Sequence, residues 1–146
     1  MPTNSVLIDD RLLVAYLLDV KLALPKRAEL YTTAYWYYRA CRAAVAGSVG
    51  QLSGPFRALP ADEEARAVQG LLQLPEHIGL PESRRLVPEM AEVARRHPPL
   101  NVLNIEAVAA ARLLRARVLL SPPATRGVLP AALADEDIRW DTVALG

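Results

Sequence analysis

The spacing of apolar residues along this chain alternates between short apolar runs and helical periodicity. Residues 5–8 form an apolar run that predicts a short buried strand. The chain then turns at Asp9 and Asp10 and continues with apolar residues at helical spacing over about 11–19. The two acids are therefore predicted at the carboxyl end of a strand, where open α/β sheets bind ligands and metals.

The remaining segments repeat this alternation. Apolar periodicity and helix-ending residues predict helices over about 33–46, from Pro60 to Leu72, from Pro88 to Pro98, over 102–115 and over 128–133. Short apolar runs predict strands at 78–80, 117–121 and 138–143. A flexible segment is predicted at Gly47, Gly50, Gly54 and Pro55. Strands that alternate with helices are typical of an α/β fold with a parallel sheet covered on both faces, here as a single domain over 1–146.

Polar residues at the ends of these segments predict helix caps. Thr32 or Thr33 can cap the helix over 33–46, and Asn101 can cap the one over 102–115. The acids at 62–64 suit the positive end of a helix dipole. Those at 135–137 predict a solvated turn before the last strand.

Composition excludes several classes of protein. With 146 residues, 52% of them hydrophobic, the chain can bury a real core. A net charge of +1 argues against a protein that coats nucleic acid with a basic surface, and the single Cys41 excludes an internal disulfide or a zinc site with several cysteines. The apolar run Leu12–Leu18 is too short to cross a bilayer, and no secretion leader is apparent, so we expect a cytoplasmic protein with no membrane contact.

Four segments occur along the chain in a characteristic order: Val6–Asp9, Thr32-Thr33, Ile105–Ala111 and Val118–Ser121. In order and spacing they resemble the PIN domain family, the fold of the VapC-type ribonuclease toxins. The resemblance implies a three-layer α/β domain whose central, mainly parallel, twisted sheet has four to five short strands flanked by helices. It also implies three or four carboxylates at the carboxyl edge of the sheet. These hold Mg²⁺ or Mn²⁺, which activates water and stabilises the charge on a scissile phosphate.

Only part of that acidic set is present here. The first acid of the family falls on Asp9, and the third falls on Glu106. The positions after the first acid are usually small and hydroxylated, but this chain has Asp10 and Arg11. The second acid falls on Arg39, a cation that would repel a metal ion. Two of the four acids therefore remain, and one lost position has reversed its charge.

The fourth acid of the family normally follows the third strand, close to a serine or threonine. Ser121 is present, but Pro122 and Pro123 occupy the place of the acid. Two carboxylates can still bind a hydrated magnesium ion weakly, and Asp10 could add a third. We favour a salt bridge between Arg39 and Asp9 or Glu106, because a guanidinium would compensate carboxylates in a partly buried cleft.

A cluster of aromatic residues near the second helix has two interpretations. It consists of Tyr31, Tyr35, Trp36, Tyr37 and Tyr38. The rings, Trp36 among them, could stack on the bases of single-stranded RNA, with Arg39 and Arg42 binding phosphates. Because adjacent aromatic residues point to all sides of a helix, a subunit interface in a homodimer is the favoured interpretation. His77 and His97 have no partner at metal-ligand spacing and are expected to have surface or capping roles.

The sequence therefore favours a degenerate PIN-like domain, catalytically impaired, that binds a protein partner, a second copy of itself, or RNA. In that case no cofactor is expected. The alternative is a Mg²⁺- or Mn²⁺-dependent endoribonuclease that uses Asp9, Asp10 and Glu106, with Asp9 and Glu106 as the metal ligands. A third possibility is a structural partner in a protein complex that makes no contact with nucleic acid. Ser121 is a candidate binding residue in the first two cases.

Overall fold

The computed structural model describes residues 4–46 and 59–145. Within them five parallel strands form one sheet in the order β3-β2-β1-β4-β5. The strands are β1 (Ser5–Ile8), β2 (Glu29–Tyr31), β3 (Ile78–Gly79), β4 (Arg117–Leu120) and β5 (Trp140–Thr142). The central strand β1 pairs with β2 through Val6 and Leu30 and with β4 through Leu7 and Val118. The predicted parallel sheet is therefore confirmed.

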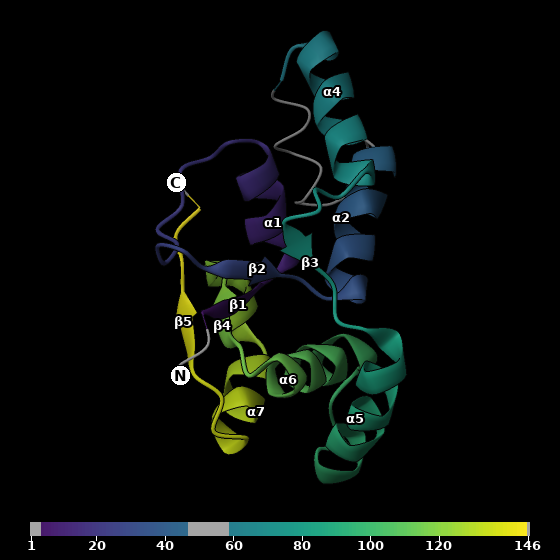
Figure 1. Cartoon of the computed structure of the whole chain (residues 1–146), viewed down its shortest axis with the longest axis vertical. Coiled ribbons are helices and arrows are strands. Elements are labelled where there is room, and N and C mark those ends of the chain that lie inside the picture. Colours follow the sequence, from purple (N-terminus) through teal and green to yellow (C-terminus); the bar gives the residue numbers. More distant parts are fainter. Residues whose placement is uncertain (1–3, 47–58, 146) are drawn as a thin grey trace.

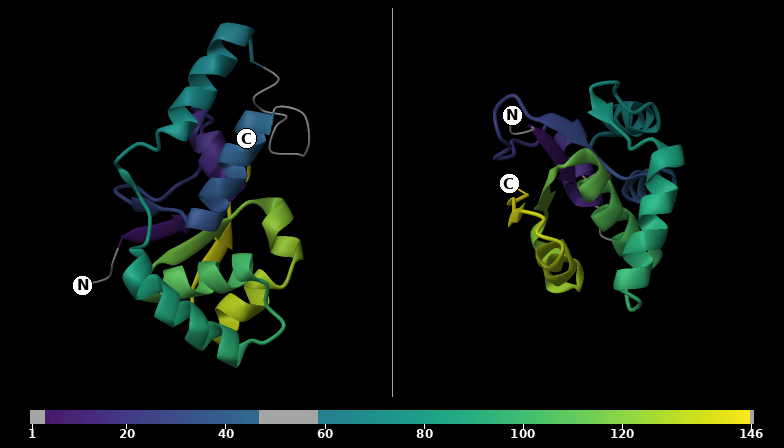
Figure 2. Two further views of the ribbon diagram at one scale, coloured as in Figure 1. Left: turned by 90° about the vertical axis from the view of Figure 1, so that its right-hand side faces the viewer. Right: turned by 60° about the horizontal axis from the view of Figure 1, so that its bottom comes forward.

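Helices cover both faces of this sheet (Figure 1). One layer contains α1 (Asp10–Leu17), α2 (Ala34–Ala46) and α4 (Ala61–Leu72). The other contains α5 (Ser83–Arg96), α6 (Val102–Leu114) and α7 (Leu129–Asp135). The left view of Figure 2 shows α4 at one end of the molecule and α5, α6 and α7 at the other. The arrangement is a three-layer α/β fold.

The alternation of side chains along the strands explains the two layers. Successive residues of a strand point to opposite faces of a sheet. Leu7 of β1 packs with the α5–α6–α7 layer, whereas Val6 and Ile8 pack with the α1–α2–α4 layer. All residues of β1 are buried, which is the pattern of a central parallel strand covered on both faces. The core therefore consists of two apolar layers, one on each side of the sheet.

Two short elements were not expected from the sequence. The strand β2 has only three residues, Glu29–Tyr31, and its first residue is exposed, so it has no apolar run to mark it. A 3₁₀ helix, η1 (Pro122–Arg126), follows Ser121, where two prolines preset the backbone for a tight turn. The predicted glycines Gly47, Gly50 and Gly54, with Pro55, lie outside the described residues.

The helix predicted to begin at Pro88 begins earlier, at Ser83, and Pro88 lies inside it. The side chain of Glu82 caps this helix by accepting a hydrogen bond from the backbone N–H of Arg84 at 3.0 Å. Pro88 lacks the N–H that would donate to the carbonyl four residues earlier, so the helix continues with one hydrogen bond fewer. Burial of Leu86 anchors the turn before the proline. The caps predicted at Thr33 and Asn101 are confirmed, by hydrogen bonds of 3.0 Å to the N–H groups of Trp36 and Asn104.

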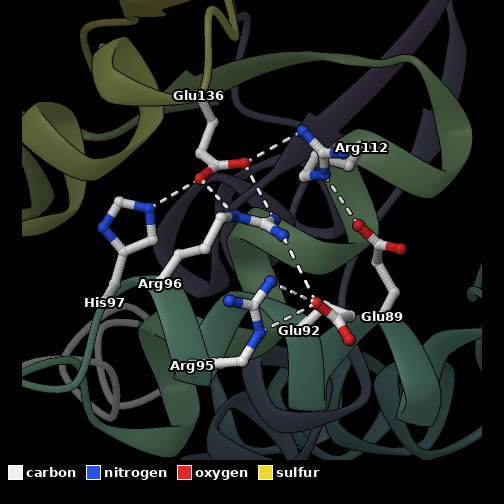
Figure 3. A network of polar contacts seen from close by, with 7 residues as sticks. All are labelled: Glu89, Glu92, Arg95, Arg96, His97, Arg112 and Glu136. Atoms are coloured by element: carbon white, nitrogen blue, oxygen red, sulfur yellow. Dashed lines mark hydrogen bonds and ion pairs between the residues drawn. The ribbon is translucent and has the colours of Figure 1, made fainter.

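A network of ion pairs joins the three helices of one layer (Figure 3). Glu136, at the end of α7, has a side chain only 7% exposed. Its carboxylate accepts hydrogen bonds from Arg96 Nε at 3.0 Å, His97 Nε2 at 2.7 Å and Arg112 Nη1 at 2.9 Å. The hydrogen bonds from Arg96 and then His97, with the charges of Arg96 and Arg112, lower the pKa of Glu136 to about 2. The solvated turn predicted at 135–137 is therefore wrong for the side chain of Glu136, which is the centre of a polar network whose arginines Arg96 and Arg112 are 31% and 40% exposed.

In the described part of the chain, no helix is both long enough and apolar enough to span a membrane.

Candidate functional site

The carboxyl ends of β1 and β4 meet at one edge of the sheet, and Asp9 joins them. This residue follows β1, caps α1 and is 0% exposed. Its Oδ1 accepts a hydrogen bond from Leu12 N at 2.9 Å, and its Oδ2 accepts two from Ser121, from N at 2.8 Å and from Oγ at 2.6 Å. Burial raises the pKa of Asp9, and these hydrogen bonds offset part of that effect. The first acid of the predicted site therefore binds protein donors through both of its oxygens.

Asp10 makes an ion pair with Arg39. The distance from Arg39 Nε to Asp10 Oδ2 is 3.2 Å, and the two side chains are 44% and 8% exposed respectively. The other carboxylate oxygen of Asp10 accepts a hydrogen bond from Arg11 N at 2.8 Å. Burial, and then the charge of Asp9, raise the pKa of Asp10, while Arg39 opposes this. The expected salt bridge of Arg39 is present, but its partner is Asp10 instead of Asp9 or Glu106.

Glu106 projects from α6 to the beginning of α2. It is buried, and its Oε1 accepts a hydrogen bond from Tyr35 N at 2.9 Å. The first amides of a helix have no partner within the helix, so a carboxylate there satisfies a free donor and meets the positive end of the helix dipole. Thr33, one residue before α2, satisfies a second amide, that of Trp36. Glu106 therefore holds α6 against the start of α2.

A cleft of about 200 Å³ opens beside these residues. Asp10, Arg11 and Arg39 provide its charged wall, and Leu103, Pro123 and Val128 contribute to its apolar wall. Asp9 and Glu106 are not among its lining residues. The cleft therefore presents two cations and one carboxylate. Sequence reasoning missed the contributions of Leu103 and Val128, because only the fold brings α6 and the start of α7 to this edge.

The donor set does not fit a divalent metal ion of the kind that the resemblance implies. Mg²⁺ and Mn²⁺ prefer several oxygen ligands converging on one point. Here the oxygens of Asp9 accept from Leu12 and Ser121, and Asp10 pairs with a guanidinium. Among the residues that the structure describes, no group of three or more His, Cys, Asp or Glu side chains could hold a metal ion. Instead, each acid has a separate partner from the protein.

The aromatic cluster divides between core and surface. Trp36 is 3% exposed and packs in the core, and the small part of it that remains accessible lines the cleft. The Tyr37 hydroxyl donates to the carbonyl of Leu71 at 2.8 Å. Tyr35 and Tyr38 are 40% and 56% exposed, and their rings meet edge to face at 6.1 Å. The structure thus leaves these two tyrosines, with the exposed Arg42, as the accessible part of the cluster.

The two histidines lie away from the cleft. His97 is the C-cap residue of α5 and bonds to Glu136. His77 Nε2 lies 2.9 Å from the hydroxyl of Tyr16, which places it beside α1. Capping and surface contacts, as expected from the sequence, describe both residues.

No protein-family model matches the chain. A search of the curated proteins also finds no match. Among solved structures, a chain in the 2.2 Å resolution structure of VapBC-1 from nontypeable Haemophilus influenzae is similar over 94% of this chain and 97% of that chain. The TM-score is 0.53 and the sequence identity is 12%, so the likeness concerns the fold. The three-layer α/β fold with its parallel five-stranded sheet is therefore PIN-like.

Proposed function

We propose that this chain uses a PIN-like fold for binding and has lost metal-dependent nuclease activity. The observation that carries the proposal is the ion pair between Asp10 and Arg39 in the cleft. The guanidinium of Arg39 lies 3.2 Å from the Asp10 carboxylate, in the place that a metal ion bound to this carboxylate would take. It would also repel any divalent ion that approached.

The hydrogen bonds that Asp9 and Glu106 accept from the protein support the same conclusion. Moving Asp9 to a metal would break hydrogen bonds to Ser121 and Leu12 in a site without solvent to replace them. Moving Glu106 would expose the free amide of Tyr35 at the start of α2. Metal binding would therefore cost the fold several of its own contacts.

The surface around the cleft suits a protein partner. Val128 is 57% exposed and lines the cleft together with Leu103. Apolar side chains beside arginines are typical of protein interfaces. The similar solved structure is that of VapBC-1, so the partner we propose is a protein of the toxin–antitoxin type or a second copy of this chain.

Nuclease activity is the second candidate function, because Asp9, Asp10 and Glu106 are all buried near the carboxyl edge of the sheet. Under this alternative the protein would be a Mg²⁺- or Mn²⁺-dependent endoribonuclease, and the Asp10–Arg39 pair would have to open.

A charge-reversal variant tests the loss of the metal site. We expect the wild type to show no Mn²⁺ binding by electron paramagnetic resonance titration and no Mn²⁺-dependent cleavage of single-stranded RNA. Arg39→Asp places a second carboxylate beside Asp10, so this variant should show Mn²⁺ binding that the wild type lacks. Arg42→Asp, the same charge change one turn further along α2, is the matched control and should bind no better than the wild type.

The opposite result would identify an enzyme. Mn²⁺-dependent RNA cleavage by the wild type, lost in Asp10→Asn and in Glu106→Gln, would contradict the proposal and support the ribonuclease alternative. Circular dichroism of each variant, compared with the wild type, separates loss of activity from loss of fold.

Self-association is tested on the exposed side of α2. Tyr35, Tyr38, Arg42 and Val45 recur there at helical spacing, and Val45 is 69% exposed. We expect sedimentation velocity to show a dimer of the wild type and a monomer of Tyr38→Glu. Val87→Glu, at an apolar residue 60% exposed on α5, is the control and should remain dimeric. A wild type that is monomeric at all concentrations would rule out self-association and leave a different protein as the proposed partner.

A further inference from the structure

A second, larger cavity lies at the opposite edge of the sheet from the cleft. Its volume is about 510 Å³, within the range of small-molecule sites. It is formed where α6 leads into β4 and where α7 leads into β5, which are the amino ends of these two strands. It shares no lining residue with the cleft at the carboxyl edge.

Arginine dominates the charge of this cavity. Its wall contains Arg112, Arg115, Arg117 and Arg139. The two acids in the wall are Glu136 and Asp137, so positive charge is in excess by two. Just outside the wall, Arg96 pairs with Glu136, Glu89 pairs with Arg112, and Asp141 lies near Arg117, so an excess of one positive charge remains. The net field in the cavity therefore favours an anion.

The needs of the fold explain only some of these arginines. Arg112 pairs with Glu89 and Glu136, and both Arg112 and Arg115 suit the negative end of the α6 dipole. Arg117 and Arg139 have no comparable role. Arg139 makes no ion pair with any residue in the described ranges, and its side chain is exposed.

Arg117 has an unsatisfied donor. Its Nε is buried and has no hydrogen-bond partner among the described residues. Its Nη2 lies 3.8 Å from Asp141 Oδ2, a long contact to a carboxylate that is 68% exposed. A buried donor without an acceptor is costly, and the long contact to Asp141 leaves the charge of this guanidinium only weakly compensated. The Arg117 side chain is 37% exposed, so its terminal Nη atoms, which make only this long contact, can face a ligand in the cavity.

We propose that this cavity binds a phosphate group carried by a molecule of about nucleotide size. Arginine guanidiniums match the oxygens of phosphate in geometry and charge. The apolar part of the wall, which includes Ile138 and Ala116, can cover the uncharged part of such a ligand. A free nucleotide and the phosphates of an RNA strand share this chemistry, and the experiment distinguishes them. The site does not depend on the metal chemistry of the cleft.

The test uses the full chain with three probes: inorganic phosphate and adenosine 5′-monophosphate by calorimetry, and a labelled oligouridine by fluorescence anisotropy. We expect binding that weakens with added salt, and a loss of affinity of about tenfold in Arg117→Gln and in Arg139→Gln. Arg85→Gln removes an exposed arginine of α5 outside the cavity and should bind as the wild type does.

The pattern across probes and variants decides the outcome. Binding of the mononucleotide, with the expected loss in both variants, supports a free nucleotide as the ligand. Binding of the oligouridine alone, with the same losses, supports an RNA strand. If Arg117→Gln is poorly folded, the exposed Arg139→Gln decides. No binding of any probe at low salt, or an equal loss in Arg85→Gln, overturns the proposal.

Discussion

Replacing Asp9 with alanine should lower the free energy of unfolding by about 4 kcal/mol, the largest effect that we expect from a single polar substitution. The carboxylate is 0% exposed and accepts three hydrogen bonds, from Leu12 N, Ser121 N and Ser121 Oγ. Alanine would leave these donors without an acceptor in a dry site and would also remove the cap of α1. Chemical denaturation followed by circular dichroism measures the change.

Two further variants show whether the hydrogen bonds are the cause. Asp9→Asn keeps the shape but places an amide donor opposite one of the existing donors, so it should destabilise the fold by less than alanine does. Ser121→Ala removes the 2.6 Å hydrogen bond while the backbone N–H of residue 121 remains, so its effect should be about 1–2 kcal/mol. If Asp9→Ala were as stable as the wild type, Asp9 would not have the structural role that we assign to it.

Glu136→Gln should lower the free energy of unfolding by about 2 kcal/mol at neutral pH and should change how stability depends on pH. The pKa of Glu136 falls from 4.5 to about 2 on folding. The folded state thus prefers the charged form. The stability from Glu136 is fully present above pH 4.5 and is lost as the pH falls from there towards about 2. The stability of the glutamine variant should not show this decrease between pH 4.5 and about 2.

Comparing the variant with the wild type isolates this contribution. Burial raises the pKa values of Asp9 and Asp10, so their effect has the opposite sign and weakens the fold as the pH rises above 3.8. Both proteins share that contribution, and it cancels in the difference between the two profiles. Glu92→Gln alters an exposed member of the same network (Figure 3) and should leave the wild-type profile nearly unchanged. Parallel profiles for Glu136→Gln and the wild type would refute the assignment.

The fold was predictable where the sequence pattern was strong. The buried run at β1, the alternation with helices and the caps at Thr33 and Asn101 follow from local physical rules. The strand β2 lacks such a pattern, because it owes its place to pairing with Val6 and Ile78 on either side. The beginning of α5 was misplaced because a proline usually begins a helix, whereas here Glu82 caps an earlier turn.

The site was predictable in its residues but not in its pairings. Reversed charge at Arg39 indicated an ion pair, but the choice of Asp10 depends on side-chain directions at the start of α1. Glu106 was expected as a metal ligand or as the partner of Arg39, and its carboxylate instead accepts a hydrogen bond from the first turn of α2. The low exposure of the Glu136 side chain depends on contacts with residues 24 and 40 positions away on two other helices. Such contacts are set by tertiary packing and leave no trace in local spacing.

The position of β1 between β2 and β4 also affects how the protein folds. Asp9 and Ser121 are 112 residues apart, and the loop between them must close before their hydrogen bonds form. Parallel pairing across such separations makes folding slow compared with that of a helical bundle of the same size. During synthesis β1 is made before β4, so the edge of β1 that pairs with β4 stays open until β4 emerges. The synthesis of β4 thus controls when β1 becomes protected on both edges.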